Sequence, residues 1–175
     1  MIKEQLPNSN DDHILGEPMA KNTAPCIAYA CYKIASRDPD SVVVVAPSDH
    51  LIIDKAEFIK QVNSGMNFAN QNDALVTLGI KPSRPDTGYG YIQYKEDEVE
   101  EGIHKVKTFT EKPNLELAQQ FLDSGDFLWN AGIFIWKVDS VVNAFENHLL
   151  EMSDLFKSGE NDYFTSRESE FIGRV

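Results

Sequence analysis

The side chains best suited to chemistry lie in short loops that directly follow apolar segments. The first of these loops, PSDH, follows the apolar run 42–46 and contains Asp49. Ligands of open α/β sheets bind at the carboxyl ends of strands, and a carboxylate there can hold Mg²⁺, which prefers oxygen ligands. The alternative is that Asp49 caps a turn and His50 is a packing residue. A Ser/His/Asp triad is not favoured, because three consecutive side chains cannot converge as their proton transfers require.

Two further loops contain groups that suit a phosphorylated sugar. In FTEKP, Glu111 can accept hydrogen bonds from hydroxyl groups, and Lys112 can neutralise phosphate charge. In WNAGIF, the amide of Asn130 can donate to and accept from a hydroxyl, and the small residue Gly132 leaves room for a ring. Each pattern also has a plainer explanation. The first could be a solvated ion pair before a turn, and the second a core strand with an edge asparagine.

A glycine-rich loop, TGYGYI, could approach a ligand closely. Gly88 and Gly90 flank Tyr89 in this loop, and glycine permits positive φ and close contact between backbone and ligand. The pattern is neither GxGxxG nor a Walker motif, so it indicates neither a dinucleotide-binding loop nor a P-loop. The alternative is an ordinary glycine-rich turn.

A segment that leads into a predicted helix, EPMAKNTAP, offers backbone donors. The first N–H groups of a helix have no intrahelical partner, and the positive end of the helix dipole lies there. Asn22 and Thr23 could therefore bind a base or a phosphate, or they could simply cap the helix.

Composition limits the classes of protein to which the chain can belong. The 175 residues suffice for one domain, and 42% hydrophobic with 25% charged residues is typical of globular chains. The formal net charge of −12 disfavours nucleic-acid binding, which needs a basic surface. It also means that a polyanion must be held by local lysines, helix N-termini or a divalent cation.

The chain has no run of 18 apolar residues and no apolar signal region, so we expect no membrane segment. Cys26 and Cys31 lie five residues apart on different faces of a predicted helix and should not pair, which favours a cytoplasmic location. The isolated His13, His104 and His148 lack the spacing of metal ligands and are interpreted as structural or surface residues.

Alternating strands and helices must position these loops. The β-branched runs 42–46 and 74–80 predict strands buried on both faces, with a helix at 55–71 between them and Asp54 as its N-cap. This order predicts a right-handed crossover and an α/β fold with a Rossmann-like, mostly parallel sheet flanked by helices. The other predicted strands lie at 14–16, 91–95, 103–110 and within 127–138. The other predicted helices are 24–37, one that Asn114 caps and that runs to about Ser124, and 139–151.

Together and in this order, EPMAKNTAP, PSDH, TGYGYI, FTEKP and WNAGIF resemble the mannose-1-phosphate guanylyltransferase family of sugar-1-phosphate nucleotidyltransferases. The match runs from about Glu17 to Trp136, roughly two-thirds of the chain. Each motif alone is weak, but the ordered set is specific. The resemblance implies a nucleotide-diphospho-sugar transferase fold that uses Mg²⁺ and transfers GMP from GTP to mannose 1-phosphate, giving GDP-mannose and pyrophosphate.

The resemblance also implies a role for each motif. No protein nucleophile would be needed, because the phosphate of mannose 1-phosphate attacks the α-phosphorus of GTP, aided by positioning and charge neutralisation. Lys21 stands where arginine is frequent in the family, which keeps the charge but loses the planar fork. The implied site comprises Asp49 as Mg²⁺ ligand, Lys112 at the sugar phosphate, Glu111 at the mannose hydroxyls, Gly88, Tyr89, Gly90, Asn130 and Gly132 around the sugar, and Glu17, Asn22 and Thr23 near guanine.

Two parts of the family pattern are absent from this sequence. Nothing before Glu17 resembles the first strand and its GGxGxRLxP-type phosphate loop, and no second metal-binding aspartate follows the sugar motifs. We therefore expect residues 1–175 to form a single, partial catalytic domain that lacks the N-terminal strand and phosphate loop and has little or no transferase activity. The unpaired sheet edge would favour a homodimer.

Two alternative functions stay open, and a third is disfavoured. The chain could be a sugar-phosphate-binding fragment, or a nucleotidyltransferase for another sugar 1-phosphate. A glycosyltransferase is disfavoured, because Asp49 has no second aspartate two residues away to complete an Asp-x-Asp metal motif.

Overall fold

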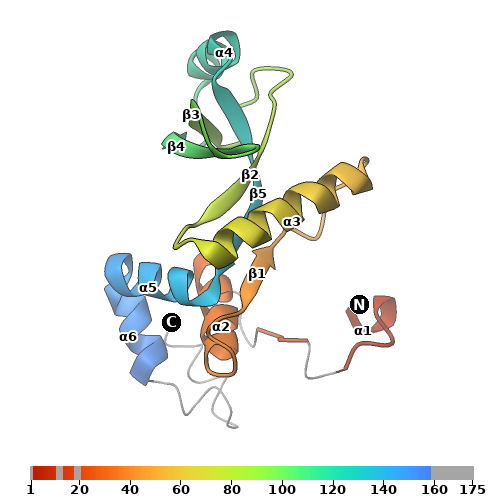
Figure 1. The fold of residues 1–175 in the computed structure, drawn as a ribbon, viewed down its shortest axis with the longest axis vertical. Helices are drawn as coiled ribbons and strands as arrows, with labels where there is room; N and C mark the ends of the chain where they lie inside the picture. The colour runs from red at the N-terminus through yellow and green to blue at the C-terminus, as the bar shows by residue number, and fades with distance from the viewer. Residues whose placement is uncertain (1, 11–13, 18–20, 159–175) are drawn as a thin grey trace. The chain divides into compact units, whose positions relative to one another are not determined.

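The computed structural model describes residues 2–10, 14–17 and 21–158, which fall into two compact units (Figure 1). The strand unit is Val42–Lys137, and the helical unit consists of the described residues before and after it. His13 and the segment 161–175, for which no structure was assigned from sequence, lie outside the described residues. Among the described residues, no helix combines the length and apolarity needed to cross a bilayer.

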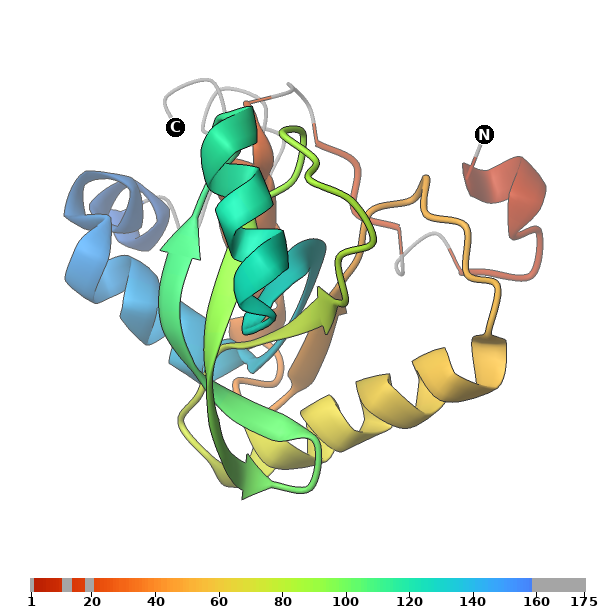
Figure 2. The same cartoon turned by 90° about the horizontal axis from the view of Figure 1, so that it is seen from above.

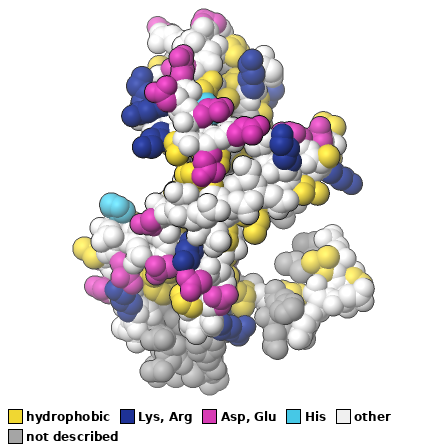
Figure 3. All heavy atoms as spheres, viewed as in Figure 1, with side chains coloured by type: hydrophobic (Ala, Val, Ile, Leu, Met, Phe, Trp, Pro, Cys, Tyr) yellow, Lys and Arg dark blue, Asp and Glu magenta, His cyan; other side chains and the backbone are white. Residues whose placement is uncertain are grey.

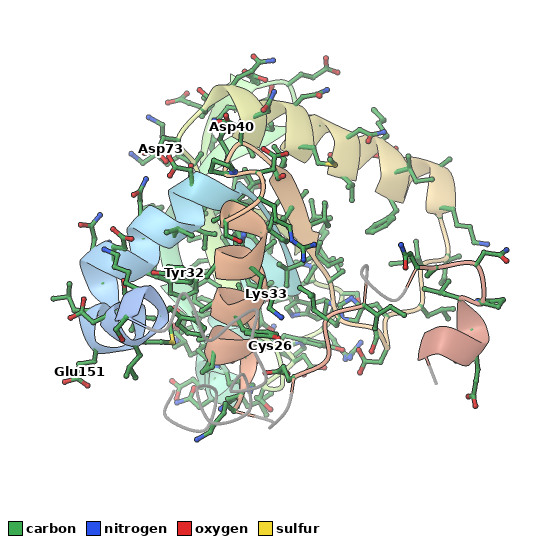
Figure 4. The ribbon with its side chains drawn as sticks, turned by 90° about the horizontal axis from the view of Figure 1, so that it is seen from below. Cys26, Tyr32, Lys33, Asp40, Asp73 and Glu151 are labelled. Carbon is green, nitrogen blue, oxygen red and sulfur yellow. The ribbon has the colours of Figure 1, made fainter. Side chains whose placement is uncertain are left out.

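The helical unit is built around α2. Its elements are α1 (Ile2–Gln5), α2 (Thr23–Ala35), α5 (Val138–His148) and α6 (Leu150–Ser158), and α2 packs against both α5 and α6. The rings of Tyr32 and Phe156 stack with their centroids 5.0 Å apart, and the Tyr32 hydroxyl lies 3.0 Å from Ser153 Oγ. Cys26, Tyr32 and Lys33 are labelled along α2 in Figure 4. Cys26 and Cys31 form no disulfide with each other, as predicted.

The strand unit confirms most of the predicted helices and strands. Local capping explains why the helix limits could be predicted. Asp54 accepts a hydrogen bond from the Glu57 N–H at the start of α3, and Asn114 accepts one from the Leu117 N–H at the start of α4, both at 2.9 Å. The elements are β1 (Val42–Val45), α3 (Lys55–Gln71), β2 (Val76–Ile80), β3 (Tyr91–Glu100), β4 (Ile103–Thr110), α4 (Leu115–Ser124) and β5 (Phe127–Lys137).

The α/β class is confirmed, but the prediction of a mostly parallel sheet is wrong. Every pairing between the described strands is antiparallel: β1, β2 and β3 each pair with β5, and β3 also pairs with β4. Because β1 and β2 are both antiparallel to β5, they run in the same direction, with α3 as the crossover. They are not neighbours, however, because β5 lies between them, and Ile135 pairs with Val44 on one side and Val76 on the other.

Two further expectations about the strands are wrong. The apolar runs of β1 and β2 are half-buried or exposed rather than buried on both faces, because each has β5 as its single strand neighbour among the described residues. The described residues 14–17 form no strand. In contrast, β5 is the central strand, and its side chains alternate between buried and half-buried positions.

One core cluster of the strand unit includes a residue of α4, the teal helix in front of the strands in Figure 2. Tyr91, Ala118, Phe127 and Trp129 form a buried cluster against which Phe121 packs. The rings of Phe121 and Phe127 stack with their centroids 3.9 Å apart. This cluster fixes the end of β5 at which β3 enters the sheet.

Candidate active-site groove

Along one edge of β5, two different strands pair with its two ends and leave a gap between them, which we call the split. Trp129, near the start of this strand, pairs with β2 and β3, whereas Ile135, near its end, pairs with β2 and β1. Since β2 follows one edge throughout, β1 and β3 share the opposite edge and leave 130–133 between them. The loop that leaves β1 and the loop that enters β3 therefore meet beside the WNAGIF motif.

A bulge in β5 occupies this split. Thr77 and Gly79 of β2 are two residues apart, but their partners Phe134 and Asn130 are four apart. Gly132 accommodates the extra length with φ at +67°, a left-handed conformation that glycine adopts without strain. The bulge therefore explains why a glycine, Gly132, lies two residues after Asn130.

A groove of about 1360 Å³ opens at the split, entirely within the strand unit. It brings together side chains from four of the five predicted motifs. Lys112 does not line the groove, but its Nζ lies 3.4 Å from Glu111 Oε1, and its φ of +42° is one that non-glycine residues seldom adopt. The predicted residues that line the groove are Asp49, Gly88, Tyr89, Gly90, Glu111, Asn130 and Gly132.

Gly90 allows the carboxylate of Glu111 to lie close to Asn130. A Cβ atom on Gly90 would lie 2.8 Å from Glu111 Oε2 and 3.5 Å from the Cβ of Asn130. The Asn130 N–H donates to the Gly90 carbonyl at 2.8 Å, which joins the two segments directly. The absent side chain thus leaves space in which a carboxylate acceptor and an amide can face the same small ligand.

Hydrogen bonds brace the glycine loop, residues 84–90. The buried Tyr91 hydroxyl donates to the Asp86 carbonyl and accepts from the Asp86 N–H, both at 2.9 Å. The Asp86 carboxylate accepts from the Gly88 N–H at 2.8 Å and from Arg84 at 2.6 and 3.0 Å. The hydrogen bond from Gly88, and to a smaller extent those from Arg84, hold the pKa of Asp86 below its ordinary value. The guanidinium of Arg84 lies 5.2 Å from the centroid of the Trp129 ring.

The loop after β1, residues 46–54, also borders the groove, but its Asp49 carboxylate is not braced in this way. Asp49 is exposed, and its carboxylate makes no hydrogen bond or ion pair with the described residues. Leu51 and Ile53 are 85% and 88% exposed, far more than is usual for side chains of this size. Asp49 is therefore available to a ligand, but the described residues do not hold it in place.

The EPMAKNTAP candidates belong to the helical unit. The Asn22 side chain accepts from the Thr23 N–H at 3.0 Å, so Asn22 caps α2, the plainer of the two predicted roles. Burial, followed by a hydrogen bond and negative charge from Glu17, raises the pKa of the Cys26 thiol.

Nearly the whole chain matches a known protein family. Residues 1–169 match the family described as Nucleotidyl transferase. The chain belongs to the nucleotidyl transferase family. This membership confirms the resemblance that was inferred from the ordered motifs.

Relatives of this nucleotidyl transferase chain include the xanthan biosynthesis protein XanB of Xanthomonas campestris, which is 44% identical over 71% of this chain and 26% of its own length. A mannose-1-phosphate guanylyltransferase of Salmonella montevideo is 38% identical over 79% of this chain and 30% of its own length. The chain thus spans about a third or less of the length of these relatives. A crystal structure described as mannose-1-phosphate geranyltransferase from Thermus thermophilus shares the fold, with a TM-score of 0.80 and 24% identity over 92% of this chain and 46% of its own.

The groove of this nucleotidyl transferase chain is acidic. Its charged lining consists of four carboxylates, those of Asp49, Asp54, Glu57 and Glu111, and one ammonium, that of Lys105. On the face seen in Figure 3, acidic and basic side chains are interspersed over the β3–β4 hairpin and α4. A triphosphate therefore needs added positive charge to enter the groove, whereas a sugar hydroxyl does not.

Three residues that shape the groove of this nucleotidyl transferase chain were not identified from its sequence. Asp86 lies two residues before a loop glycine, the spacing of an Asx-type turn, and this signal could have identified it. The sequence predicts Tyr91 in a strand but gives no sign of its hydroxyl contacts. Thr77, whose hydroxyl lies 3.1 Å from Asn130 Oδ1, is predicted only as one residue of a buried strand, and nothing in the sequence singles it out.

Proposed function

We propose that the chain serves the transfer of GMP from GTP to mannose 1-phosphate, which gives GDP-mannose and pyrophosphate. The observation that supports this proposal best is the convergence of Asp49, Glu111 and Asn130, from segments far apart in sequence, on one groove of the strand unit. Relatives named for mannose-1-phosphate guanylyltransferase activity support the choice of substrates.

The sugar end of the proposed site lies around Gly90. Glu111 accepts hydrogen bonds from sugar hydroxyls, and Asn130 contacts a neighbouring oxygen from the other side of the glycine. Lys112, which is 64% exposed and next to Glu111, neutralises the phosphate of the sugar. Gly88, Tyr89 and Gly132 complete the lining, while Glu17, Asn22 and Thr23 are proposed to lie near guanine. Residues 1–175 are proposed to act as a single domain.

Asp49 suits a magnesium ion as one ligand of several. The described residues contain no cluster of three or more His, Cys, Asp or Glu side chains that could enclose a metal. Mg²⁺ is commonly bound through one or two carboxylates, with water and substrate phosphates filling the other positions, so a single exposed aspartate fits this role. When bound there, the ion would supply the positive charge that the acidic groove lacks.

The proposed chemistry asks this chain to bind and orient rather than to form a covalent intermediate. A phosphate oxygen of mannose 1-phosphate forms a bond to the α-phosphorus of GTP, and the bond from that phosphorus to pyrophosphate breaks. Lys112 offsets charge on the attacking phosphate, while Glu111 and Asn130 hold the sugar in line.

A sugar-phosphate-binding role without transfer is the second candidate, and the charge of the groove favours it. Four carboxylates face one lysine, so the groove by itself is better suited to hydroxyl groups than to a triphosphate. On this account mannose 1-phosphate binds without a metal, and GTP binds weakly or not at all.

Separate titrations of the two ligands test both candidates. We expect calorimetry to show mannose 1-phosphate binding with or without Mg²⁺, and GTP binding that requires Mg²⁺. Asp49→Asn should weaken metal-dependent GTP binding about tenfold, because one charged ligand of the metal is lost. Asp97→Asn, which removes an exposed acid outside the groove, should change neither titration.

Chromatographic detection of GDP-mannose from the two substrates with Mg²⁺ tests the transfer itself. Formation of GDP-mannose supports transfer. Mannose 1-phosphate binding without product supports the second candidate, and binding of neither ligand contradicts both.

A further inference from the structure

At the bulge in β5, side chains form hydrogen bonds with two backbone groups. The Gly132 N–H donates to Asn130 Oδ1 at 3.1 Å. The Ile133 carbonyl accepts from the Thr77 hydroxyl, also at 3.1 Å. The same hydroxyl lies 3.1 Å from Asn130 Oδ1, so its single hydrogen is within reach of both oxygens.

These contacts determine which way the Asn130 amide faces. The Gly132 N–H can only donate, so the Asn130 atom that faces it must be the oxygen. If the amide were flipped, its NH₂ group would point its hydrogens at the hydrogen of Gly132. The Thr77 hydroxyl can share its hydrogen with the same oxygen, but it can also accept, so the Gly132 N–H is what determines the orientation.

The orientation gives Asn130 a defined role in the groove. With Oδ1 directed into the bulge, the remaining polar group is the Nδ2 amino group, which no described residue accepts from. Asn130 is half-buried and lines the groove beside Gly90 and Glu111. It therefore offers a ligand a donor, while Glu111 next to it offers an acceptor.

We propose that Thr77 is a positioning residue that, together with the Gly132 N–H, locks the Asn130 amide so that its amino group donates to an oxygen of the bound sugar phosphate. This inference rests on the proposed function, since it concerns the same sugar site. Thr77 need not touch the ligand: it acts on affinity through Asn130.

A purely structural role for Thr77 would have different consequences. The Ile133 carbonyl loses its partner when the hydroxyl is removed, so Thr77→Val should lower stability whether or not Asn130 is present. An effect on ligand affinity that disappears when Asn130 is absent would instead act through the amide. A double-mutant cycle separates the two.

The first experiment is calorimetric titration of mannose 1-phosphate into the wild-type chain and its variants. We expect Thr77→Val to weaken binding about three- to tenfold, the range for one lost hydrogen bond, and Thr77→Ser to stay within about twofold of wild type. In the Asn130→Ala background, Thr77→Val should have no further effect on affinity. Wild-type affinity in Thr77→Val, or an equal loss in both backgrounds, would overturn the proposal.

The second experiment needs no variant, and its first measurement needs no ligand. A scalar coupling across the hydrogen bond from the Gly132 amide nitrogen to the Asn130 side-chain carbonyl carbon, measured by NMR in the free chain, reports that the oxygen faces Gly132. Its absence would overturn the orientation even if Thr77→Val proved too unstable to titrate. On addition of mannose 1-phosphate, the Asn130 NH₂ signals should shift, and unchanged signals at saturation would also overturn the proposal.

The two readouts separate this inference from the proposed function. If the coupling is present but mannose 1-phosphate does not bind, the proposed sugar site fails. The Asn130 amide is then held in the inferred orientation but donates to no sugar phosphate. If mannose 1-phosphate binds and the coupling is absent, the site stands and the role of Thr77 fails.

Discussion

The two loops that border the groove are built in opposite ways. Residues 84–90 are tied to the buried Tyr91 and to each other through Asp86, whereas in residues 46–54 Asp49 has no partner among the described residues and Ile53 is 88% exposed. The first loop is preorganised, because its bonds exist before any ligand arrives. In the second loop, only a bound ligand could hold the carboxylate of Asp49 in place, because no described residue does. The part of the groove that we propose to bind the sugar is therefore shaped in advance, whereas the carboxylate that we propose to bind the metal is not held in place.

The largest expected effect comes from filling the space beside Gly90 in the preorganised loop 84–90. Gly90→Ala places a Cβ 2.8 Å from Glu111 Oε2, so the carboxylate must move away from the sugar position. Affinity for mannose 1-phosphate should fall about 10- to 100-fold, as expected for a displaced binding group. The displaced atom is the end of a flexible side chain, so folding should be largely retained. Titration calorimetry measures the loss, and Gly16→Ala, at a site with open space, is the control. Unchanged affinity would show that this loop is not preorganised.

The next largest effect concerns the Tyr91 hydroxyl, which braces the loop 84–90 from the core. Tyr91→Phe removes the hydroxyl that bonds both backbone groups of Asp86, and the free energy of unfolding should fall by about 1–3 kcal/mol. Tyr94→Phe is the matched control, because the Tyr94 ring contacts His104 but its hydroxyl makes no hydrogen bond with the described residues. Urea denaturation measures both. Equal effects of the two variants would show that the Tyr91 hydroxyl contributes no special bracing.

A smaller, pH-dependent effect follows from the lowered pKa of Asp86. The ordinary value is 3.8 and the folded value is lower, so the stabilisation is present above about pH 4 and is lost as pH falls through the folded pKa. Asp86→Asn should therefore be less stable than wild type at neutral pH, and the difference should shrink on acidification. Melting temperatures between neutral pH and about pH 2 measure it. A difference that does not vary with pH would mean that the charge on Asp86 is unimportant.

The smallest expected effect lies in the loop of residues 46–54. Ile53→Ala should change the free energy of unfolding by less than about 0.5 kcal/mol, because the side chain is already 88% exposed. The same substitution at Ile92, which is 3% exposed, should cost about 2–4 kcal/mol through the cavity it leaves. Chemical denaturation compares the pair. A large loss at Ile53 would show that this loop packs against something after all.

Features set by local chemistry could be predicted well. The limits of α3 followed from Asp54 as its cap and those of α4 from Asn114, because capping depends on residues within one helical turn. The ordered motifs also identified the family, since five loops in fixed order form a pattern that composition cannot imitate.

Features set by long-range pairing could not be predicted. The rule that strands flanking a helix become parallel neighbours was correct about the direction of β1 and β2 and wrong about their adjacency. β5 comes about fifty residues after β2, and its pairing depends on which apolar surfaces remain to be covered. The half-exposed surfaces of β1 and β2 have the same origin, because a valine run has the same sequence pattern in a central strand and in an edge strand.

The sequence by itself determined which side chains are available for chemistry, where the capped helices begin, and the family to which the chain belongs. The tertiary structure alone decided that β1 and β3 share one edge of β5, that Lys112 stands outside the groove while Glu111 lines it, and that Thr77 reaches Asn130 across the bulge. The physical reason is range. Caps and motifs act over a few residues, whereas the split in the sheet arises from backbone pairing between segments that the chain brings together only when it folds.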